Sequence, residues 1–398
     1  MKSNENINER FKWQRFFIST FGLWPLQRDN FYRKFRIGYY LCQLIILTVS
    51  VVYKLSINCG DVDDTLLSYL LLIGSIMIFI KIFYASTCRD YLKRLLISSY
   101  QDWESIKNAD YIELMVNNSA TYNTVSLLIC SSSLISIILY DIKIIFFTDS
   151  SSVPILDHQL NRTVYKDQLQ FLLPSSCIFN NVSQNLYYVI LINQMVQSYI
   201  IIAGGSCSSA MFILVTGHIC GQFDILIKRM DKFCDNNYNF EVKNHELTMI
   251  IQRHQHLIFL SDSLEIVYNK VILTQMAGCL TSLSISGIVL LLSINEKDII
   301  TTMRSACIMN LIILESYIFA HMADTLSGKG DVMLRTIYSY WYKIPIINKN
   351  IVVITMRLCT APYLTVGKFF NLTNESFMDI IKTAFSYLSV LRLFLIES

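Results

Sequence analysis

Long apolar stretches separated by short polar ones dominate the chain from residue 36 onward. A helix needs about 20 mostly apolar residues to cross about 30 Å of hydrocarbon, and six stretches reach that length with few internal charges. A seventh stretch, Phe377–Ile396, is long enough but contains charged residues. Because a chain in lipid satisfies its backbone hydrogen bonds as helices, the pattern predicts an all-α polytopic membrane protein with seven transmembrane helices. The first six spans are Arg36–Leu55, Thr65–Tyr84, Tyr122–Phe147, Asn185–Thr216, Val271–Ile294 and Ile299–Met322.

Two further apolar segments are not predicted to span the membrane. Ile351–Leu364 is too short and is flanked by Pro345 and Pro362, so we expect a buried or interfacial helix. In the stretch 217–270, apolar residues recur at helical spacing between charged ones, which predicts that the fourth span continues as an amphipathic helix. This helix is either a solvated stem or, as we favour, a surface for subunit assembly. Its apolar positions are Phe223, Ile227, Met230 and Phe233.

The basic residues predict the orientation. Of the 33 lysines and arginines, 25 belong to the N-terminal segment or to the loops after spans two, four and six, counting Arg36 at the start of span one and Lys81 near the end of span two. The alternate loops contain only Lys54, Arg162, Lys166 and Lys297. Since basic residues concentrate on the cytoplasmic side of a membrane, the N-terminus is predicted to be cytoplasmic. Seven crossings then place the C-terminus outside.

The loop 148–184 is predicted to be extracellular, and its sequons agree with that side. Asn161 and Asn181 begin Asn-X-Ser/Thr sequences there and are predicted glycosylation sites. Of the 11 cysteines, Cys59 and Cys177 lie in predicted outer loops, where a disulfide is conceivable, although small apolar filling is the commoner role for such residues.

Composition narrows the function classes. The chain is 53% hydrophobic and 16% charged, which excludes a disordered chain, and its net charge of +3 is too small to favour nucleic-acid binding. No catalytic motif or metal-binding spacing is present, and His254 and His256, two positions apart, point to different faces of a helix. The sequence therefore predicts neither an enzyme nor a cofactor.

Polar residues follow one face of the last predicted span. They recur in steps of three and four, as one face of a helix requires, and polar groups in lipid are costly unless they face water or a partner. The stripe favours either the wall of a water-filled pore with an apolar outer ring or an ordinary helix–helix contact. The polar residues of this face are Asp379, Lys382, Ser386 and Ser389, and the apolar ring at its outer end would be Val390 and Leu393.

Aromatic and methionine residues lie in the outer halves of spans two, three, four and six. Most residues of this kind belong to a core, but a small apolar ligand would find its pocket there. These residues are Tyr69, Tyr140, Met195, Tyr199 and Met309.

Three segments resemble those of a known family, the insect odorant receptors, which are seven-helix ligand-gated cation channels. Phe21-Gly-Leu-Trp-Pro-Leu26 is similar to the segment before the family's first span, and the nine residues from His218 to Leu226 resemble an element found in bee, wasp and ant members. The third, most characteristic segment comprises Leu364–Phe370 and Ile381–Arg392.

The resemblance implies a plasma-membrane channel subunit of sensory-neuron dendrites, which binds a volatile organic molecule and forms a heterotetramer around one pore. The partner would be a shared odorant receptor co-receptor, and this chain would be the ligand-tuning subunit because it lacks the co-receptor's longer loop after span four. It implies a hydrophobic gate at Val390 with Ser389 beside it. The implied pore set is Ser386, Ser389, Val390, Leu393 and Phe394, and the positional ligand set is Tyr69, Ile73, Ser136, Tyr140, Met195, Tyr199, Ser305 and Met309.

The same resemblance divides the chain into segments. Residues 1–35 form a cytoplasmic segment with a short interfacial helix, and 36–322 contain the first six spans and the ligand pocket. Residues 217–270 and 323–370 form a cytoplasmic anchor, and 371–398 form the pore-lining helix.

Three alternatives stay open. The related gustatory receptors have a terminal pattern that Ser386-Tyr387 and Leu393-Phe394 match in part. A G-protein-coupled receptor would need the opposite orientation. A membrane enzyme or transporter lacks support from catalytic clusters or internal repeats.

Overall fold

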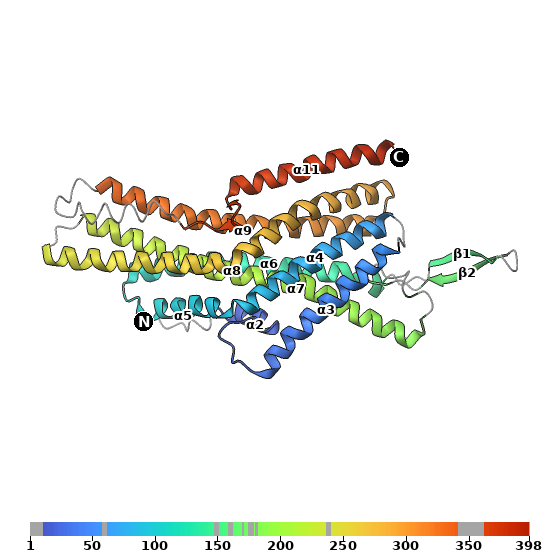
Figure 1. Ribbon diagram of the computed structural model, residues 1–398, viewed down its shortest axis with the longest axis horizontal. Coiled ribbons are helices and arrows are strands. Elements are labelled where there is room, and N and C mark those ends of the chain that lie inside the picture. Colours follow the sequence, from blue (N-terminus) through green and yellow to red (C-terminus); the bar gives the residue numbers. More distant parts are fainter. Residues whose placement is uncertain are drawn as a thin grey trace.

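Each of the seven predicted spans coincides with part of one long helix, apart from Phe147 at the end of the third span, which lies outside the described residues. The computed structural model describes residues 11–57, 62–146, 151–157, 162–168, 171–173, 179, 182–235, 240–340 and 362–397. The helices that contain the spans are α3 (Phe31–Ser56), α4 (Val62–Thr87), α6 (Ala109–Phe146), α7 (Gln184–Asp235), α8 (Phe240–Asn295), α9 (Ile299–Tyr340) and α11 (Asn374–Glu397). Two shorter helices, α2 (Lys12–Thr20) and α5 (Arg89–Ser105), accompany them (Figure 1).

Six of the long helices, α3, α4, α6, α7, α8 and α9, are long and apolar enough to cross a membrane. Helix α11 is not among these six. The six membrane-spanning helices therefore agree with the predicted polytopic fold, and the crossing by α11 stays a prediction.

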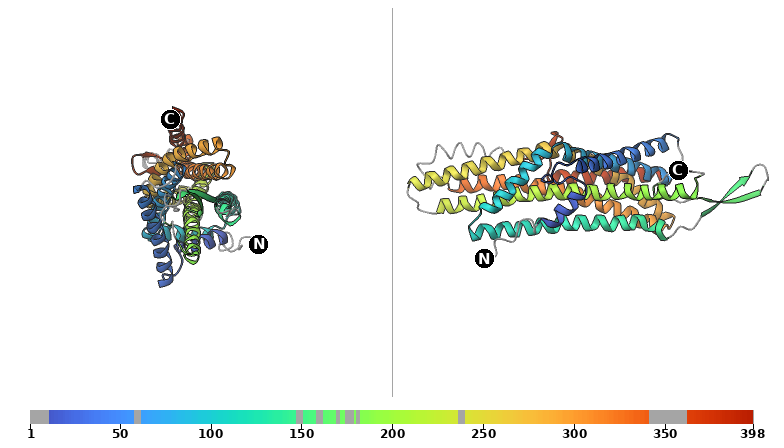
Figure 2. Two further views of the ribbon diagram at one scale, coloured as in Figure 1. Left: turned by 90° about the vertical axis from the view of Figure 1, so that its right-hand side faces the viewer. Right: turned by 90° about the horizontal axis from the view of Figure 1, so that it is seen from below.

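Helix α7 forms the centre of the bundle. Helices α6, α8 and α9 pack against it, and 89% of its most apolar stretch is buried inside the molecule. Figure 2 shows it running almost the full length of the structure. A helix that is apolar all round and buried all round is a core helix, so α7 owes its position to packing within its own chain.

Helices α7 and α8 extend well beyond one bilayer thickness. They contain 52 and 56 residues, and at about 1.5 Å per residue each is about 80 Å long, against about 30 Å of hydrocarbon. The predicted continuation of the fourth span as a helix is confirmed. The amphipathic stripe on it is not an exposed assembly surface, because Phe223, Met230 and Phe233 are at most 3% exposed in the hydrophobic core of the chain itself.

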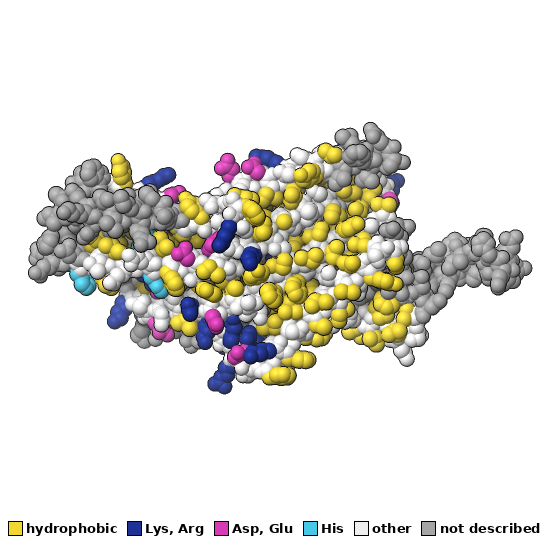
Figure 3. Space-filling model, viewed as in Figure 1, with side chains coloured by type: hydrophobic (Ala, Val, Ile, Leu, Met, Phe, Trp, Pro, Cys, Tyr) yellow, Lys and Arg dark blue, Asp and Glu magenta, His cyan; other side chains and the backbone are white. Residues whose placement is uncertain are grey.

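The charged and apolar side chains on the surface occupy different halves of the molecule along the long axis of the bundle. Figure 3 shows charged side chains gathered over the half of the molecule that contains the α7–α8 extension, whereas the half nearer the β1–β2 hairpin is mostly apolar. On that apolar half, α3 exposes Ile45, Ile46, Val49 and Val52. Large contiguous apolar surface of this kind suits contact with lipid, and the charged half is the one that the basic residues predict to be cytoplasmic.

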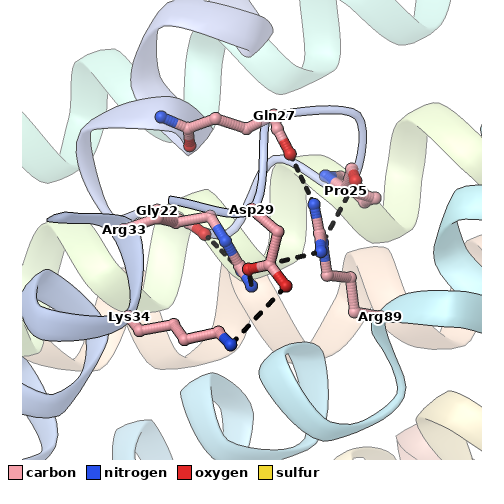
Figure 4. Close-up of polar contacts among 7 residues, drawn as sticks. All are labelled: Gly22, Pro25, Gln27, Asp29, Arg33, Lys34 and Arg89. Atoms are coloured by element: carbon pink, nitrogen blue, oxygen red, sulfur yellow. Dashed lines mark hydrogen bonds and ion pairs between the residues drawn. The ribbon is translucent and has the colours of Figure 1, made fainter. Parts of the chain in front are cut away.

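The segment Phe21–Leu26 forms a tight elbow between α2 and α3. Gly22 has a φ of +71°, a conformation that side-chain-bearing residues rarely adopt, and Phe21 and Trp24 are buried beside it. Figure 4 shows how arginines from two helices bind the elbow's backbone. Arg33 donates to the Gly22 carbonyl at 3.3 Å, and Arg89 donates to the Pro25 carbonyl at 3.2 Å and to the Gln27 carbonyl.

The carboxylate of Asp29, three residues after the elbow, forms ion pairs with three basic side chains around it. It lies 2.8 Å from Arg33, 3.7 Å from Lys34 and 3.8 Å from Arg89. The hydrogen bond from Arg33 is the main reason that the pKa of Asp29 is below its usual value. Because Arg33 of α3 and Arg89 of α5 both bind the elbow and Asp29, these contacts hold the first turn of α3 next to the first turn of α5.

Two small antiparallel hairpins were not predicted. Strands β1 (Ser151–Asp157) and β2 (Arg162–Gln168) pair antiparallel and project from one end of the bundle (Figure 2). Strands β3 (Thr365–Val366) and β4 (Phe370–Asn371) pair before α11. The turn between β3 and β4 requires positive φ at Gly367 and Lys368, and the Thr365 amide donates to Glu265 of α8 at 2.9 Å.

Several predictions fall outside the described residues. They concern the sequons at Asn161 and Asn181, the cysteine pair Cys59 and Cys177, and residues 351–361 of the short apolar segment.

Candidate ligand cavity and pore-lining helix

A cavity of about 180 Å³ lies inside the apolar half of the bundle. Helices α4, α6, α7, α8 and α9 form its wall, together with Leu173 of the segment before α7. Spans two, three, four and six, which were predicted to surround a ligand pocket, all contribute to this wall, and span five contributes as well. That the cavity holds the ligand stays a prediction. The aliphatic part of the wall comprises Leu67, Leu70, Leu71, Met77, Ile78, Ile201, Ile202, Ile308, Leu311 and Ile312.

A glycine of α7, Gly205, forms part of the cavity wall where α4 and α9 come close to α7. A Cβ at this position would lie 2.9 Å from Ile78 Cδ1 and 3.5 Å from Glu315 Oε1. A side chain there would displace the end of Ile78, so the glycine favours the close approach of α4 and α9 to α7.

A buried ion pair lies at the cavity wall. Lys81 Nζ of α4 donates to Glu315 Oε2 of α9 at 2.9 Å, and Ser209 Oγ of α7 donates to Glu315 Oε1 at 3.2 Å. Lys81 also lies 5.6 Å from the ring centre of Phe319. Lys81 was counted among the basic residues of a cytoplasmic loop, but it is 1% exposed within α4. Ionisable groups inside a membrane bundle mark functional positions.

The remaining polar groups on the wall are a minority of its residues. They are Ser136 of α6, Ser198 and Ser206 of α7, Gln275 and Ser282 of α8, and Arg304 of α9. Gln275 Nε2 donates to Ser316 Oγ at 3.0 Å. An apolar cavity with a small number of fixed polar groups is the usual form of a small-molecule site.

The positionally predicted ligand residues lie mostly beside the cavity rather than on it. Ser136 lines it. Tyr199 instead stacks on Phe21, with ring centres 5.6 Å apart, and Tyr69 is 44% exposed on the outer face of α4. The others with described side chains lie on contributing helices but not on the wall; they are Ile73, Met195, Ser305 and Met309. The side chain of Tyr140 lies outside the described part of the chain.

Sequence reasoning missed Lys81, Gln275, Arg304 and Glu315. The available signal was an ionisable or amide side chain inside an apolar stretch, which is expensive in lipid unless it faces a partner or a cavity. Lys81 and Glu315 are 234 positions apart, so nothing local to either residue indicates that they meet.

Helix α11 lies along the outside of the bundle (Figure 1). One face packs on α8, where Ala384 is 2% exposed and Leu388 covers Gly287. The predicted polar stripe faces away from the chain, because Ser386, Ser389 and Val390 are all exposed. The side chains of Leu393 and Phe394 are not among those described.

The two charged residues of the stripe, Asp379 and Lys382, form an ion pair with each other. Lys382 Nζ lies 3.1 Å from Asp379 Oδ1, and both side chains are well exposed. Local pairing keeps the two charges together on a face that no other described residue covers.

Within the part of the chain that the structure describes, no group of three or more His, Cys, Asp or Glu side chains is placed to hold a metal ion. The two close histidines are separated, since His256 contacts Ser98 Oγ at 3.0 Å while His254 is buried against Phe223.

Comparison with known proteins gives one family and one fold. The family model described as 7tm Odorant receptor matches residues 61–385. The fold is similar to that of the insect olfactory receptor OR5 from Machilis hrabei in complex with eugenol, with a TM-score of 0.76 at 11% identity over 97% of this chain and 99% of that one. The same receptor in a second structure gives 0.75 at 12% identity, over 96% and 97% of the two chains. No curated protein sequence matches.

Proposed function

Because the chain belongs to the 7tm odorant receptor family, we propose that it is a ligand-binding subunit of a non-selective cation channel that volatile organic molecules open. The observation that carries this proposal is the apolar cavity within the membrane half of the bundle. Such a cavity binds small apolar molecules by removing their surface from water, at roughly 25 cal/mol per Å².

Helix α8 connects the cavity to the proposed pore. Gln275 and Ser282 of α8 line the cavity, and two residues further along, Ser284 Oγ donates to the Ala384 carbonyl of α11 at 3.4 Å. Gly287 of α8 lies under Leu388 of α11. A ligand that shifts α8 in the cavity therefore changes the surface on which α11 rests, because close-packed helices move as rigid units.

The exposed face of α11 would line the pore once several subunits surround one axis. Ser386 and Ser389 would face the water, and Val390 would close the outer end by excluding it. The family's co-receptor is the proposed partner in this heterotetramer. The chain would lie in the plasma membrane with its N-terminus inside and its C-terminus outside, as the basic residues predict.

Electrophysiology tests this proposal directly. The full chain is expressed with a co-receptor and currents are recorded while a panel of volatile compounds is applied. We expect currents that persist in the presence of a G-protein inhibitor. Currents that the inhibitor abolishes would indicate a G-protein-coupled receptor instead.

The orientation has its own test. A tag fused after Ser398 should bind antibody on intact cells. A tag that becomes accessible only after permeabilisation would overturn both the orientation and the pore assignment.

A further inference from the structure

The cavity wall contains an acidic group with unused hydrogen-bonding capacity. Glu315 accepts one hydrogen bond at each oxygen, from Lys81 and from Ser209, whereas a carboxylate offers about four lone-pair sites. The Glu315 side chain is 16% exposed and Lys81 only 2%, and Glu315 lines the cavity. The carboxylate is therefore the member of the ion pair that a bound molecule can reach.

A second acceptor lies on the same wall. The Nε2 atom of Gln275 donates to Ser316, the residue that follows Glu315, while Gln275 Oε1 is buried and accepts no hydrogen bond from any residue that the structure describes. A buried carbonyl without a donor costs free energy. The Gln275 oxygen is buried behind the wall, so Glu315, whose side chain is partly exposed, is the acceptor that a hydrogen-bond donor in the cavity can reach.

The charges on the wall favour a neutral donor over a cationic one. Lys81 already neutralises Glu315, and Arg304 adds a second cation to the lining. A protonated amine at Glu315 would lie close to the Lys81 ammonium and be repelled by it, and a carboxylate has no proton to donate to Glu315. A hydroxyl group donates a hydrogen bond and carries no charge.

The volume limits the size of the molecule. A cavity of about 150 Å³ holds benzene, and this one measures about 180 Å³. It therefore accommodates roughly six to ten non-hydrogen atoms. Resting on the proposed function, we propose that the cavity selects small neutral alcohols or phenols, whose apolar body contacts the aliphatic wall and whose hydroxyl donates to Glu315.

Two isomers separate hydrogen-bond donation from size. 1-Hexanol and 1-methoxypentane contain the same atoms, but only the alcohol donates. Binding to the full chain in lipid nanodiscs is measured from the ligand-induced rise in melting temperature, at matched free aqueous concentrations. We expect the alcohol to bind about tenfold more tightly, as a hydrogen bond to a charged group provides. We expect 1-aminohexane and hexanoic acid to bind more weakly than the alcohol.

A double variant tests whether Glu315 is the acceptor. Lys81→Met with Glu315→Leu removes the ion pair without leaving an unpaired charge, and should abolish the preference for the alcohol while leaving the affinity for the ether within about twofold. The matched control is Lys54→Met with Asp64→Leu. It removes another pair with a buried lysine, 3.7 Å apart and away from the cavity wall, and should keep the preference.

The outcomes separate this inference from the proposed function. Equal binding of the two isomers, tightest binding of the acid, or a preference that survives in the Lys81/Glu315 double variant would each overturn the inference. If volatile compounds still evoke currents in that case, the proposed function stands. If no compound binds or evokes a current, both are contradicted. A double variant that does not fold leaves the comparison of isomers on the unmodified chain to decide.

Discussion

Helices α7 and α11 are both predicted from the sequence as spans, but their packing within the chain is opposite. Helix α7 is enclosed by α6, α8 and α9, and 89% of its most apolar stretch is buried. Helix α11 packs on one side only and leaves Phe385, Tyr387 and Val390 about half exposed. The difference indicates that changes around α7 should act on the stability of the subunit, and changes on α11 on what the subunit does in an assembly.

The largest loss of stability is expected where a charge is left unpaired beside α7. Glu315→Leu leaves Lys81 buried without its anion, and should destabilise the chain by about 3–5 kcal/mol. Adding Lys81→Met should restore most of that loss. Thermal unfolding of both variants in nanodiscs measures it, and a double variant as unstable as the single one would show that the pair is not the cause.

Close packing of α7 against α6 gives the next largest effect. A Cβ at Gly217 would lie 2.4 Å from a ring carbon of Tyr122, so Gly217→Ala should cost about 1–3 kcal/mol through overpacking. The control is Gly38→Ala in α3, where no atom lies within 4 Å of the added carbon and where alanine should be neutral or stabilising by up to about 1 kcal/mol. Equal melting temperatures for the two variants would contradict this account of α7.

A smaller, pH-dependent effect is expected at Asp102 of α5, which is bound to α7. Its carboxylate accepts from His218 at 3.0 Å and lies 2.7 Å from Arg253. Burial alone would raise the pKa of Asp102, but these two hydrogen bonds outweigh it and the pKa lies below its usual 3.8.

Because its folded-state pKa is lowered, Asp102 stabilises the protein above the unfolded pKa of about 3.9, and this contribution is lost as the pH falls further. Melting temperatures measured from pH 6 to pH 3 should decline at the acidic end, and Asp102→Asn should decline less steeply. An identical slope in the variant would exclude this group.

The smallest effect on stability is expected at the exposed face of α11. Val390→Ala should change the free energy of unfolding by less than about 0.5 kcal/mol, since the side chain is 51% exposed. If Val390 is the gate, the same change should increase current in the absence of ligand. Val52→Ala in α3, where the side chain is 49% exposed, is the control and should alter neither property. Unchanged gating in Val390→Ala would remove this residue from the pore.

Part of this architecture follows from the sequence because lipid imposes simple requirements. Spans of about 20 apolar residues must be helical, and the described residues of all seven predicted spans lie within helices. The continuation of α7 was likewise visible in helical periodicity, whereas the elbow at Phe21–Leu26 was not predicted. Helical spacing also predicted that Ser386, Ser389 and Val390 share one face of the last helix. All three are exposed, so this face points away from the rest of the described chain.

Only the tertiary structure decided which apolar faces meet one another. Lipid and protein neighbours are equally apolar, so periodicity does not distinguish a face that contacts lipid from one that packs in the core. Phe223 and Met230 therefore proved to be core residues, and Tyr69 proved to be exposed. The cavity depends on helix rotation and on close approach at Gly205, and the Lys81–Glu315 pair depends on two helices brought together from distant parts of the chain. Helix lengths are set locally, whereas contacts between helices are set by the whole bundle.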